Sequence, residues 1–279
     1  LAIARGEAVT DLLKGKVLGS IFFEPSTRTR LSFETAMNRL GGGVIGFAGT
    51  EATSVVKGET LADTIRMVSG YTDAVVLRHP REGAAKLATE FSDKPIINAG
   101  DGAGQHPTQT LLDLFTIRQE MGRLEGLNIS LVGDLRYGRT VHSLAFALSK
   151  FGNTINLVSP EGLEMPDEVV EHLESSGQFG VACHAPEEVI SQTDILYVTR
   201  IQKERFPDPV EYKKVAGKYQ IDPELVSQGP DNMIVMHPLP RINEITPEVD
   251  VMPQAKYFTQ AANGVPVRMA LLSMVIGGN

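Results

Sequence analysis

The sequence is short of cysteine and of long apolar runs, and both shortages narrow the class of protein. Cys183 is the single cysteine and cannot form a disulfide within the chain, and no Cys/His cluster has the spacing of a zinc site. A reducing cytoplasm without structural zinc is therefore expected. Stretches such as Leu271–Ile276 are far shorter than the roughly 20 apolar residues that span a membrane, and no signal-peptide pattern opens the chain.

Positive charge is also scarce. The chain has 26 Lys and Arg residues against 34 Asp and Glu residues, a net charge of −8. This balance argues against a nonspecific nucleic-acid binder and a basic membrane-surface protein, so we expect neither nucleic acid nor membrane as a partner. An anionic small ligand would need only a local basic pocket. With 279 residues, 42% of them hydrophobic, the chain is long enough for two domains of about 150 residues each.

Short apolar runs alternate with longer amphipathic segments along the whole chain, an order typical of parallel sheets covered by helices. The sequence predicts an α/β fold of two doubly wound parallel-sheet domains joined by helices, with the active site in the interdomain cleft. The predicted domains are 1–108, completed by the C-terminal helix 263–279, and 109–262, which includes the joining helix. The predicted strands are Val17–Phe23, Val44–Phe47, Ala74–Arg78, Pro95–Asn98, Asn128–Val132, Thr154–Val158, Asp194–Val198 and Met233–Met236. The predicted helices include Leu31–Leu40, Thr60–Tyr71, Pro107–Met121, Thr140–Lys150, Asp167–Ser175, Pro209–Val215 and Asn263–Ile276, and Leu1–Leu13 is expected to be the tail of another.

The strongest local motif is Glu24–Arg30, between a predicted strand and a predicted helix. A strand-to-helix turn directs free backbone N–H groups and the positive end of the helix dipole at one point, where hydroxyl and guanidinium groups suit a phosphate. An ordinary Ser/Thr helix cap with solvated arginines explains the pattern equally well. The candidate phosphate ligands are Ser26, Thr27, Arg28 and Thr29.

A second polar turn, Asn98–Gln109, is rich in glycine and enters a helix at Pro107. His106 and Gln109 are three residues apart, so both can reach one ligand, for which a carbonyl or amide is the expected chemistry. The alternative is a capping loop with a structural histidine. Arg78 follows another strand, and open α/β sheets bind ligands outside the carboxyl ends of their strands.

The segment Gly49–Glu59 is polar and is expected to be a mobile loop. It carries Ser54 and Lys57. Taken alone, this lysine is more simply explained as a solvated loop residue.

The second half repeats the arrangement of polar residues after strands. The turn Val132–Thr140 lacks the G-x-G-x-x-G pattern, so it supports a dinucleotide only weakly, whereas Arg139 at a helix start suits a carboxylate. Arg200 and Gln202 lie two residues apart, on one face if the chain is extended there. In His237–Arg241 two prolines predict a rigid turn that is compatible with a cis peptide bond.

Five motifs follow one another in a recognisable order: Ser26–Arg30, His106–Gln109, Asp134–Thr140, Thr199–Arg205 and His237–Pro240. Together they resemble the aspartate/ornithine carbamoyltransferase family, essentially from end to end of the chain. Members that use ornithine typically have a His-Cys-Leu-Pro turn and a Ser-Met-Gly loop. Here Pro238 replaces that cysteine and no Ser-Met-Gly occurs, so the resemblance implies L-aspartate as the acceptor.

The resemblance also implies an activity and a set of site residues. The activity is transfer of the carbamoyl group from carbamoyl phosphate to L-aspartate, the committed step of pyrimidine (UMP) synthesis. It implies that residues 1–108 bind carbamoyl phosphate and residues 109–262 bind aspartate. Carbamoyl phosphate would be bound by Ser26, Thr27, Arg28, Thr29, Ser54, Lys57, Arg78, His106 and Gln109. Aspartate would be bound by Lys57, Arg139, Arg200, Gln202, Pro238 and Leu239. The implied catalytic residues are Arg28, Thr29, Lys57, Arg78 and His106.

In the implied mechanism the neutral amine attacks the carbonyl carbon directly. The tetrahedral oxyanion is stabilised by Thr29, Arg78 and His106, and phosphate leaves with the amine proton. His106 is then a hydrogen-bond donor and not a base, and no metal or cofactor is implied. The resemblance further implies a cytoplasmic homotrimer in which the loop with Lys57 completes a neighbour's site. It leaves open whether regulatory subunits bind.

The sequence departs from the family pattern at a few points. Arg136 stands where a lysine is usual, which keeps the charge but changes its reach and hydrogen-bond geometry. The spacing of the loop leaves Thr53 as an alternative to Ser54. The sequence opens at Leu1 without a methionine, so the true N-terminus is expected to be missing, and the further N-terminal helix that is usual in the family is not found in this sequence.

Two other classes of function compete with a carbamoyltransferase. A binding protein for an anionic metabolite would use the arginines without needing the carbonyl donors His106 and Thr29. A dinucleotide oxidoreductase would need the glycine fingerprint that Val132–Thr140 lacks.

Overall fold

The computed structural model describes residues 1–51, 53–102, 106–201 and 220–277. Contacts divide the chain into two compact units. Unit 1 comprises Leu1–Leu112 with Ala262–Asn279, and unit 2 comprises Asp113–Ala261. The chain passes from the first unit to the second within helix α5 (Pro107–Met121). The predicted limits of the substrate-binding domains, at 108/109 and 262/263, stay a prediction.

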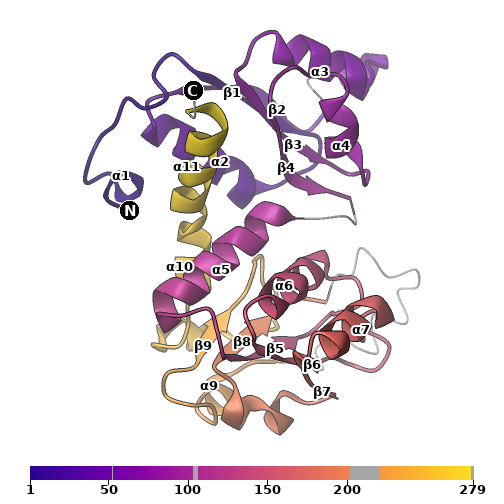
Figure 1. The fold of residues 1–279 in the computed structure, drawn as a ribbon, viewed down its shortest axis with the longest axis vertical. Coiled ribbons are helices and arrows are strands. Elements are labelled where there is room, and N and C mark those ends of the chain that lie inside the picture. Colours follow the sequence, from indigo (N-terminus) through magenta and orange to yellow (C-terminus); the bar gives the residue numbers. More distant parts are fainter. Residues whose placement is uncertain (52, 103–105, 202–219, 278–279) are drawn as a thin grey trace. The chain divides into compact units, whose positions relative to one another are not determined.

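Unit 1 contains a parallel sheet with the strand order β2-β1-β3-β4 (Figure 1). Because the chain winds outward from β1 in both directions, β1 and β3 form the switch point where such sheets bind ligands. Its strands are β1 (Val17–Phe22), β2 (Gly43–Ala48), β3 (Ala74–His79) and β4 (Ile96–Asp101). Its other helices are α1 (Ala2–Arg5), α2 (Thr27–Arg39), α3 (Leu61–Ser69), α4 (Ala84–Thr89) and α11 (Gly264–Ile276), with a 3₁₀ turn at Ser54–Lys57.

The sheet of unit 1 is covered on both faces. Phe22 points into a cluster that includes Phe33 of α2 and Leu272 of α11. The adjacent Ile21 points the other way, into a cluster with Ile65 of α3. Successive side chains of a strand alternate between faces, and burial on both explains why β1 and β3 are mostly apolar.

Unit 2 contains a second parallel sheet, in the order β7-β6-β5-β8-β9 (Figure 1). Its switch point lies between β5 and β8. The strands are β5 (Asn128–Val132), β6 (Thr154–Val158), β7 (Phe179–Cys183), β8 (Ile195–Val198) and β9 (Ile234–Met236). The helices are α6 (Arg139–Ser149), α7 (Asp167–Ser175), α9 (Pro223–Val226) and α10 (Tyr257–Ala262), with 3₁₀ turns at Pro186–Glu188, Ile190–Gln192 and Pro247–Val251.

The two parallel sheets with their helices confirm the predicted fold class. Two local predictions near the N-terminus were wrong. Helix α1 ends at Arg5, because Gly6 adopts a left-handed conformation (φ 79°), so Leu1–Leu13 is not a continuous helix. Helix α2 begins at Thr27 and not at Leu31, so its first turn contains most of the candidate phosphate ligands.

Strand β7 and the short helices α4, α9 and α10 were not predicted. Strand β7 is at the edge of its sheet and is largely half-buried or exposed, so it has no apolar run to reveal it. Helix α4 has only six residues, too few to show a helical period. The predicted helix Pro209–Val215 lies outside the described residues. In the part of the chain that the structure covers, none of the helices combines the length and apolarity needed to cross a membrane.

Candidate active site

The first turn of α2 carries positive charge where a helix normally prefers negative charge. Ser26 occupies the N-cap position, but its side chain makes no capping hydrogen bond. The turn includes Arg28 and contains no acidic residue. A cation beside the positive end of the helix dipole destabilises the helix by roughly 0.3–1 kcal/mol. The same positive charge makes the turn suitable for binding an anion.

The side chains of this turn differ in exposure. Thr27 and Arg28 are exposed, whereas Thr29 is buried. Arg30 is committed elsewhere, since its Nε donates to Glu34 Oε1 at 2.7 Å. The first turn therefore brings Ser26, Thr27, Arg28 and Thr29 together, as the sequence motif predicted. Arg30 is instead paired with Glu34 along the helix.

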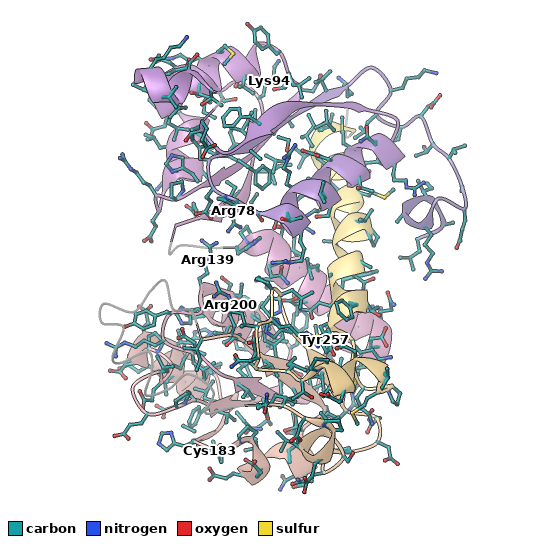
Figure 2. All side chains as sticks on the ribbon, turned by 180° about the vertical axis from the view of Figure 1, so that it is seen from behind. Arg78, Lys94, Arg139, Cys183, Arg200 and Tyr257 are labelled. Carbon is teal, nitrogen blue, oxygen red and sulfur yellow. The ribbon has the colours of Figure 1, made fainter. Side chains whose placement is uncertain are left out.

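Arg78 lies at the switch point of the first sheet and is labelled in Figure 2. It pairs in register with Phe22 at the end of β1, and its side chain is 13% exposed. Nη2 lies 2.7 Å from Glu24 Oε1, and Nη1 donates to the carbonyl of Ala99 at 3.2 Å. Nη1 also lies 3.5 Å from Nε2 of His106. Arg78 thus connects the ends of β1, β3 and β4.

His106 is the residue before α5 and is buried. Its carbonyl accepts from the N–H groups of Gln109 at 3.0 Å and Thr110 at 3.4 Å, so it occupies the N-cap position. Because a guanidinium can only donate, the contact with Arg78 uses Nε2 as an acceptor and leaves the ring proton on Nδ1. Gln109 is half-buried in the first turn of the helix. The structure therefore brings Arg78 and His106 together, beside the turn of Gln109.

The turn after β4 is held by Asp101, which is buried. Its Oδ1 accepts from Asn98 Nδ2 at 3.0 Å and its Oδ2 accepts from the N–H of Gly83 at 2.9 Å. Gly102 follows at φ 51°, where a Cβ would come within 2.6 Å of the nitrogen of Glu82. Glycine is thus required at this position, which explains part of the glycine-rich motif.

The loop with Ser54 and Lys57 forms a 3₁₀ turn. Thr53 caps it by accepting from the N–H of Val55 at 3.4 Å and donates to the carbonyl of Thr50 at 2.8 Å. Ser54 and Lys57 are exposed. No hydrogen bond or ion pair among the described residues joins either side chain to Arg78, His106 or the first turn of α2.

In unit 2, Arg139 and Arg200 follow neighbouring strands. Arg139 is the first residue of α6 after β5, and Arg200 comes two residues after β8 (Figure 2). β5 and β8 pair in parallel, so both arginines lie at the carboxyl edge of the sheet, and both are half-buried. The strands approach closely here, since a Cβ on Gly133 would lie 2.3 Å from the carbonyl oxygen of Thr199. The structure thus places two cations at the switch point of the second sheet.

The residues around Arg139 give the turn its shape. Asp134 is buried, and its Oδ1 accepts from the N–H of Tyr137 at 2.8 Å. Arg136, at the position where lysine is usual, is exposed and donates to the carbonyl of Gly162 at 3.2 Å. Its guanidinium also lies over the ring of Tyr137, 5.5 Å from the centroid.

Pro238 and Leu239 follow β9, the neighbour of β8. The Leu239–Pro240 peptide is cis, and Leu239 has φ 53°, a left-handed conformation that is unusual for a bulky residue. Pro238 and Leu239 are both half-buried. Gln202 lies outside the described residues. Within the described ranges, no cluster of three or more His, Cys, Asp or Glu residues could hold a metal ion.

Three polar residues near these groups were not singled out from the sequence. Glu24, which pairs with Arg78, begins the motif Glu24–Arg30 and could have been recognised by its position. His237 and Glu244 contact each other at 2.8 Å behind the Pro238–Leu239 turn. No local pattern indicates the second pair, because six residues of irregular chain separate its members.

Comparison with known families matches both halves of the chain. Residues 2–119 match the family model for the carbamoyl-P binding domain of aspartate/ornithine carbamoyltransferases. Residues 125–275 match the Asp/Orn binding domain of the same family. The chain belongs to the aspartate/ornithine carbamoyltransferase family.

Close relatives of this carbamoyltransferase chain are archaeal. The aspartate carbamoyltransferase catalytic subunit of Archaeoglobus fulgidus is 60% identical over 274 residues, which cover 98% of this chain and 90% of the relative. That of Methanococcoides burtonii is 60% identical over 275 residues, covering 99% of this chain and 89% of the relative.

Solved structures agree with the family assignment. The catalytic subunit of M. jannaschii aspartate transcarbamoylase has 54% identity and a TM-score of 0.91, covering 99% of this chain and 92% of that one. Aspartate transcarbamoylase from Trypanosoma cruzi, in complex with carbamoyl phosphate, has 44% identity and a TM-score of 0.92, covering 99% of this chain and 89% of that one. The resemblance inferred from the motifs is therefore confirmed.

Proposed function

We propose that this carbamoyltransferase chain transfers the carbamoyl group of carbamoyl phosphate to the amine of L-aspartate. The products are N-carbamoyl-L-aspartate and phosphate, and the reaction is the committed step of de novo pyrimidine biosynthesis. The observation that carries the proposal is the pairing of Arg78 with His106 at the switch point of the first sheet. Relatives at 60% identity that are named aspartate carbamoyltransferase support aspartate as the acceptor.

Carbamoyl phosphate would bind to unit 1. Its phosphate would accept from the first turn of α2, through Ser26, Thr27, Arg28 and Thr29. The Arg78 guanidinium would contact both the phosphate and the carbonyl oxygen, and Gln109 would hold the carbamoyl amine. The T. cruzi relative, 44% identical, has been solved with carbamoyl phosphate and aspartate together, which supports this pair of substrates.

Aspartate would bind to unit 2. Its two carboxylates match the cations Arg139 and Arg200, with Gln202 as a further predicted ligand. The main-chain carbonyls of Pro238 and Leu239 would accept from its amine. Lys57, contributed by another copy of the chain, would approach both substrates.

The chemistry needs no covalent enzyme intermediate. The neutral amine forms a bond to the carbonyl carbon, and the tetrahedral oxyanion accepts from Thr29, Arg78 and His106. The carbon–oxygen bond to phosphate then breaks, and the amine proton leaves with the phosphate. Catalysis therefore comes from holding two anions in contact and stabilising the charge that develops.

We also propose a cytoplasmic homotrimer with shared active sites. The edge strand β2 has no second neighbour in its sheet, and Ile45 on it is exposed, so this edge is suited to contact with another copy. The 3₁₀ turn that follows β2 in the chain holds the exposed Lys57, and among the described residues no hydrogen bond or ion pair joins Lys57 to Arg78, His106 or the first turn of α2. Relatives are named catalytic subunits, which supports regulatory subunits as further partners.

The substrate proposal is tested by measuring phosphate release from carbamoyl phosphate with aspartate or ornithine as the acceptor. We expect turnover with aspartate, because the side-chain ammonium of ornithine would face the positive charge of Arg139 and Arg200. Faster turnover with ornithine would contradict the assignment. Binding of carbamoyl phosphate without turnover of either acceptor would favour the alternative of a binding protein for an anionic metabolite.

The shared-site proposal is tested with hybrid trimers of Lys57→Gln and Arg28→Ala. Each pure variant is expected to be nearly inactive, with at most about a tenth of the parent's activity. When the two are dissociated and reassembled together, some interfaces pair an intact loop with an intact α2 turn, so activity should return. Hybrids that are confirmed to form but stay as inactive as their parents would show that Lys57 does not act across the interface.

A further inference from the structure

His237 is buried at 1% exposure, and both of its ring nitrogens have hydrogen-bond partners. Nδ1 lies 2.8 Å from the main-chain nitrogen of Leu239, and Nε2 lies 2.8 Å from Oε1 of Glu244. A main-chain N–H can only donate, so Nδ1 must be an unprotonated acceptor. The ring proton therefore resides on Nε2, where it donates to the carboxylate.

Both carboxylate oxygens of Glu244 accept hydrogen bonds, which fix the position of the carboxylate that orients the His237 ring. Its other oxygen, Oε2, accepts from the N–H groups of Ile242 and Asn243, both at 3.0 Å. Burial by itself raises the pKa of the Glu244 carboxyl. The hydrogen bonds from His237 and Ile242 act in the opposite direction, and the net result is a pKa below the ordinary value. An ionised carboxylate therefore accepts the Nε2 proton and sets the orientation of the imidazole.

The orientation of the ring determines the direction of a peptide group. The Pro238–Leu239 peptide is trans, since Leu239–Pro240 is the cis bond in the described chain. In a planar trans peptide the C=O and N–H groups point in opposite directions. Because the Leu239 N–H points at the His237 ring, the Pro238 carbonyl must point away from it.

The start of the same turn is held from a second side. The N–H of His237 donates to Oε1 of Gln260 at 2.8 Å, and Gln260 Nε2 donates in turn to Asp113 Oδ1 at 2.7 Å. Asp113 and Gln260 are both buried. The two N–H groups of His237 and Leu239 are thus both satisfied inside unit 2, and the carbonyl of the intervening Pro238 is directed the other way.

We infer that His237 and Glu244 are positioning residues that direct the Pro238 carbonyl at the amine of the acceptor substrate. This inference rests on the proposed function, in which that carbonyl accepts from the amine of aspartate. Neither side chain touches a substrate. They act through the direction of one peptide group, so their loss should affect use of aspartate and leave binding of carbamoyl phosphate unchanged.

Two substitutions of His237 separate its two hydrogen bonds. His237→Asn places Oδ1 near the former position of Nδ1, where it can accept from the Leu239 N–H as in an Asx turn, but it loses the contact with Glu244. His237→Gln extends an amide to Glu244 but has no acceptor at the δ position. Asp250→Asn is the matched control, because it removes the ion pair with Arg241 in the same segment without contacting His237 or Leu239.

Steady-state rates are measured for the full trimer of each variant, together with thermal unfolding. We expect His237→Gln to lower kcat/KM for aspartate by about tenfold or more, the effect of losing one hydrogen bond, with KM for carbamoyl phosphate within about twofold of the parent. His237→Asn should recover most of kcat/KM for aspartate. Asp250→Asn should lower the unfolding temperature without this change in aspartate kinetics.

The result that would overturn the inference is equal kcat/KM for aspartate in His237→Asn and His237→Gln, because the acceptor at the δ position would then be irrelevant. If His237→Gln does not fold, Glu244→Asp serves instead, since it keeps the charge but is too short to reach both the ring and the loop N–H groups. A folded Glu244→Asp with unchanged kcat/KM for aspartate would likewise overturn it. A parent enzyme that is inactive with both substrates would overturn the proposed function itself, and this inference with it.

Discussion

The two units present their candidate ligands in different ways. In unit 1 the groups are side chains at strand and helix ends, with Arg78 held by Glu24 and His106 at the sheet's switch point. In unit 2 the candidate ligands are the arginines Arg139 and Arg200 and, as we propose, main-chain carbonyls, whose direction we infer to depend on a buried polar network. The type of each candidate side chain can be read from the sequence, whereas the direction of a peptide group cannot.

The network in unit 2 is centred on a buried carboxylate. Asp113 is 0% exposed, and its Oδ2 accepts from the Tyr197 hydroxyl at 2.8 Å while Oδ1 accepts from Gln260. Burial, with the charge of Asp113 beside it, raises the pKa of Tyr197 well above its ordinary value, so the hydroxyl remains the donor. Both of these donors are neutral, so these two hydrogen bonds stabilise the carboxylate without placing a positive charge beside it.

The strongest test of the side-chain site in unit 1 is His106→Ala. We expect kcat to fall by about 10²- to 10³-fold, the usual effect of removing one donor to an oxyanion, with a smaller change in KM for carbamoyl phosphate. Single-turnover and steady-state rates measure this. Unchanged turnover would make His106 a structural N-cap, as the alternative interpretation of its motif holds.

A pair of arginine variants compares the two units directly. Arg28→Ala removes charge-assisted hydrogen bonds to phosphate, so kcat/KM for carbamoyl phosphate should fall by roughly 10- to 100-fold. Arg200→Ala should instead raise KM for aspartate by a similar factor. Initial rates with each substrate varied in turn distinguish them. A KM for aspartate close to that of the parent in Arg200→Ala would show that Arg200 does not bind the acceptor.

The buried network should contribute more to stability than an exposed ion pair. Asp113→Asn replaces one carboxylate oxygen with an amide that cannot accept, so the free energy of unfolding should fall by about 1–3 kcal/mol. The control is Asp11→Asn, whose partner Lys14 lies at 2.9 Å with the two side chains 71% and 74% exposed. Chemical denaturation of both variants tests the difference. Equal free energies of unfolding in the two variants would show that the buried network stabilises unit 2 no more than the exposed ion pair does.

The smallest expected effect is a pH dependence of stability. The pKa of Glu244 is lowered in the folded chain, so its stabilising contribution is present above the unfolded value and is lost as the pH falls through the folded one. Unfolding followed from pH 6 down to about pH 3 should therefore show a shallower loss of stability in Glu244→Gln than in the parent. Parallel curves would indicate that this carboxyl does not contribute to acid unfolding.

Much of the fold could be predicted because its signals are local. The strands Asn128–Val132 and Thr154–Val158 and the helices Pro107–Met121 and Asp167–Ser175 occur with the predicted limits, since apolar periodicity and end signals mark them. Strand β7 could not be predicted in this way, because an edge strand buries little and has no strong pattern.

The candidate site likewise contains some features that local patterns predict and others that they do not. Arg78 lies at the end of a strand of a parallel sheet, and His106 and Arg139 follow such strands, so their places at the carboxyl edges follow from topology alone. The contact between Gln260 and Asp113 does not, because the two residues are 147 positions apart in the chain. No pattern within a short window of sequence contains that information.

By itself, the sequence determined the fold class, the family and the cationic and hydroxyl groups placed after each strand. These depend on periodicity, helix ends and charge, which act over a few residues. Only the tertiary structure decided which carboxylate pairs with Arg78, which nitrogen of His237 carries the proton and where the Pro238 carbonyl points. Hydrogen bonds have direction, and their partners here are brought together from distant segments, so the direction is set only when the chain has folded.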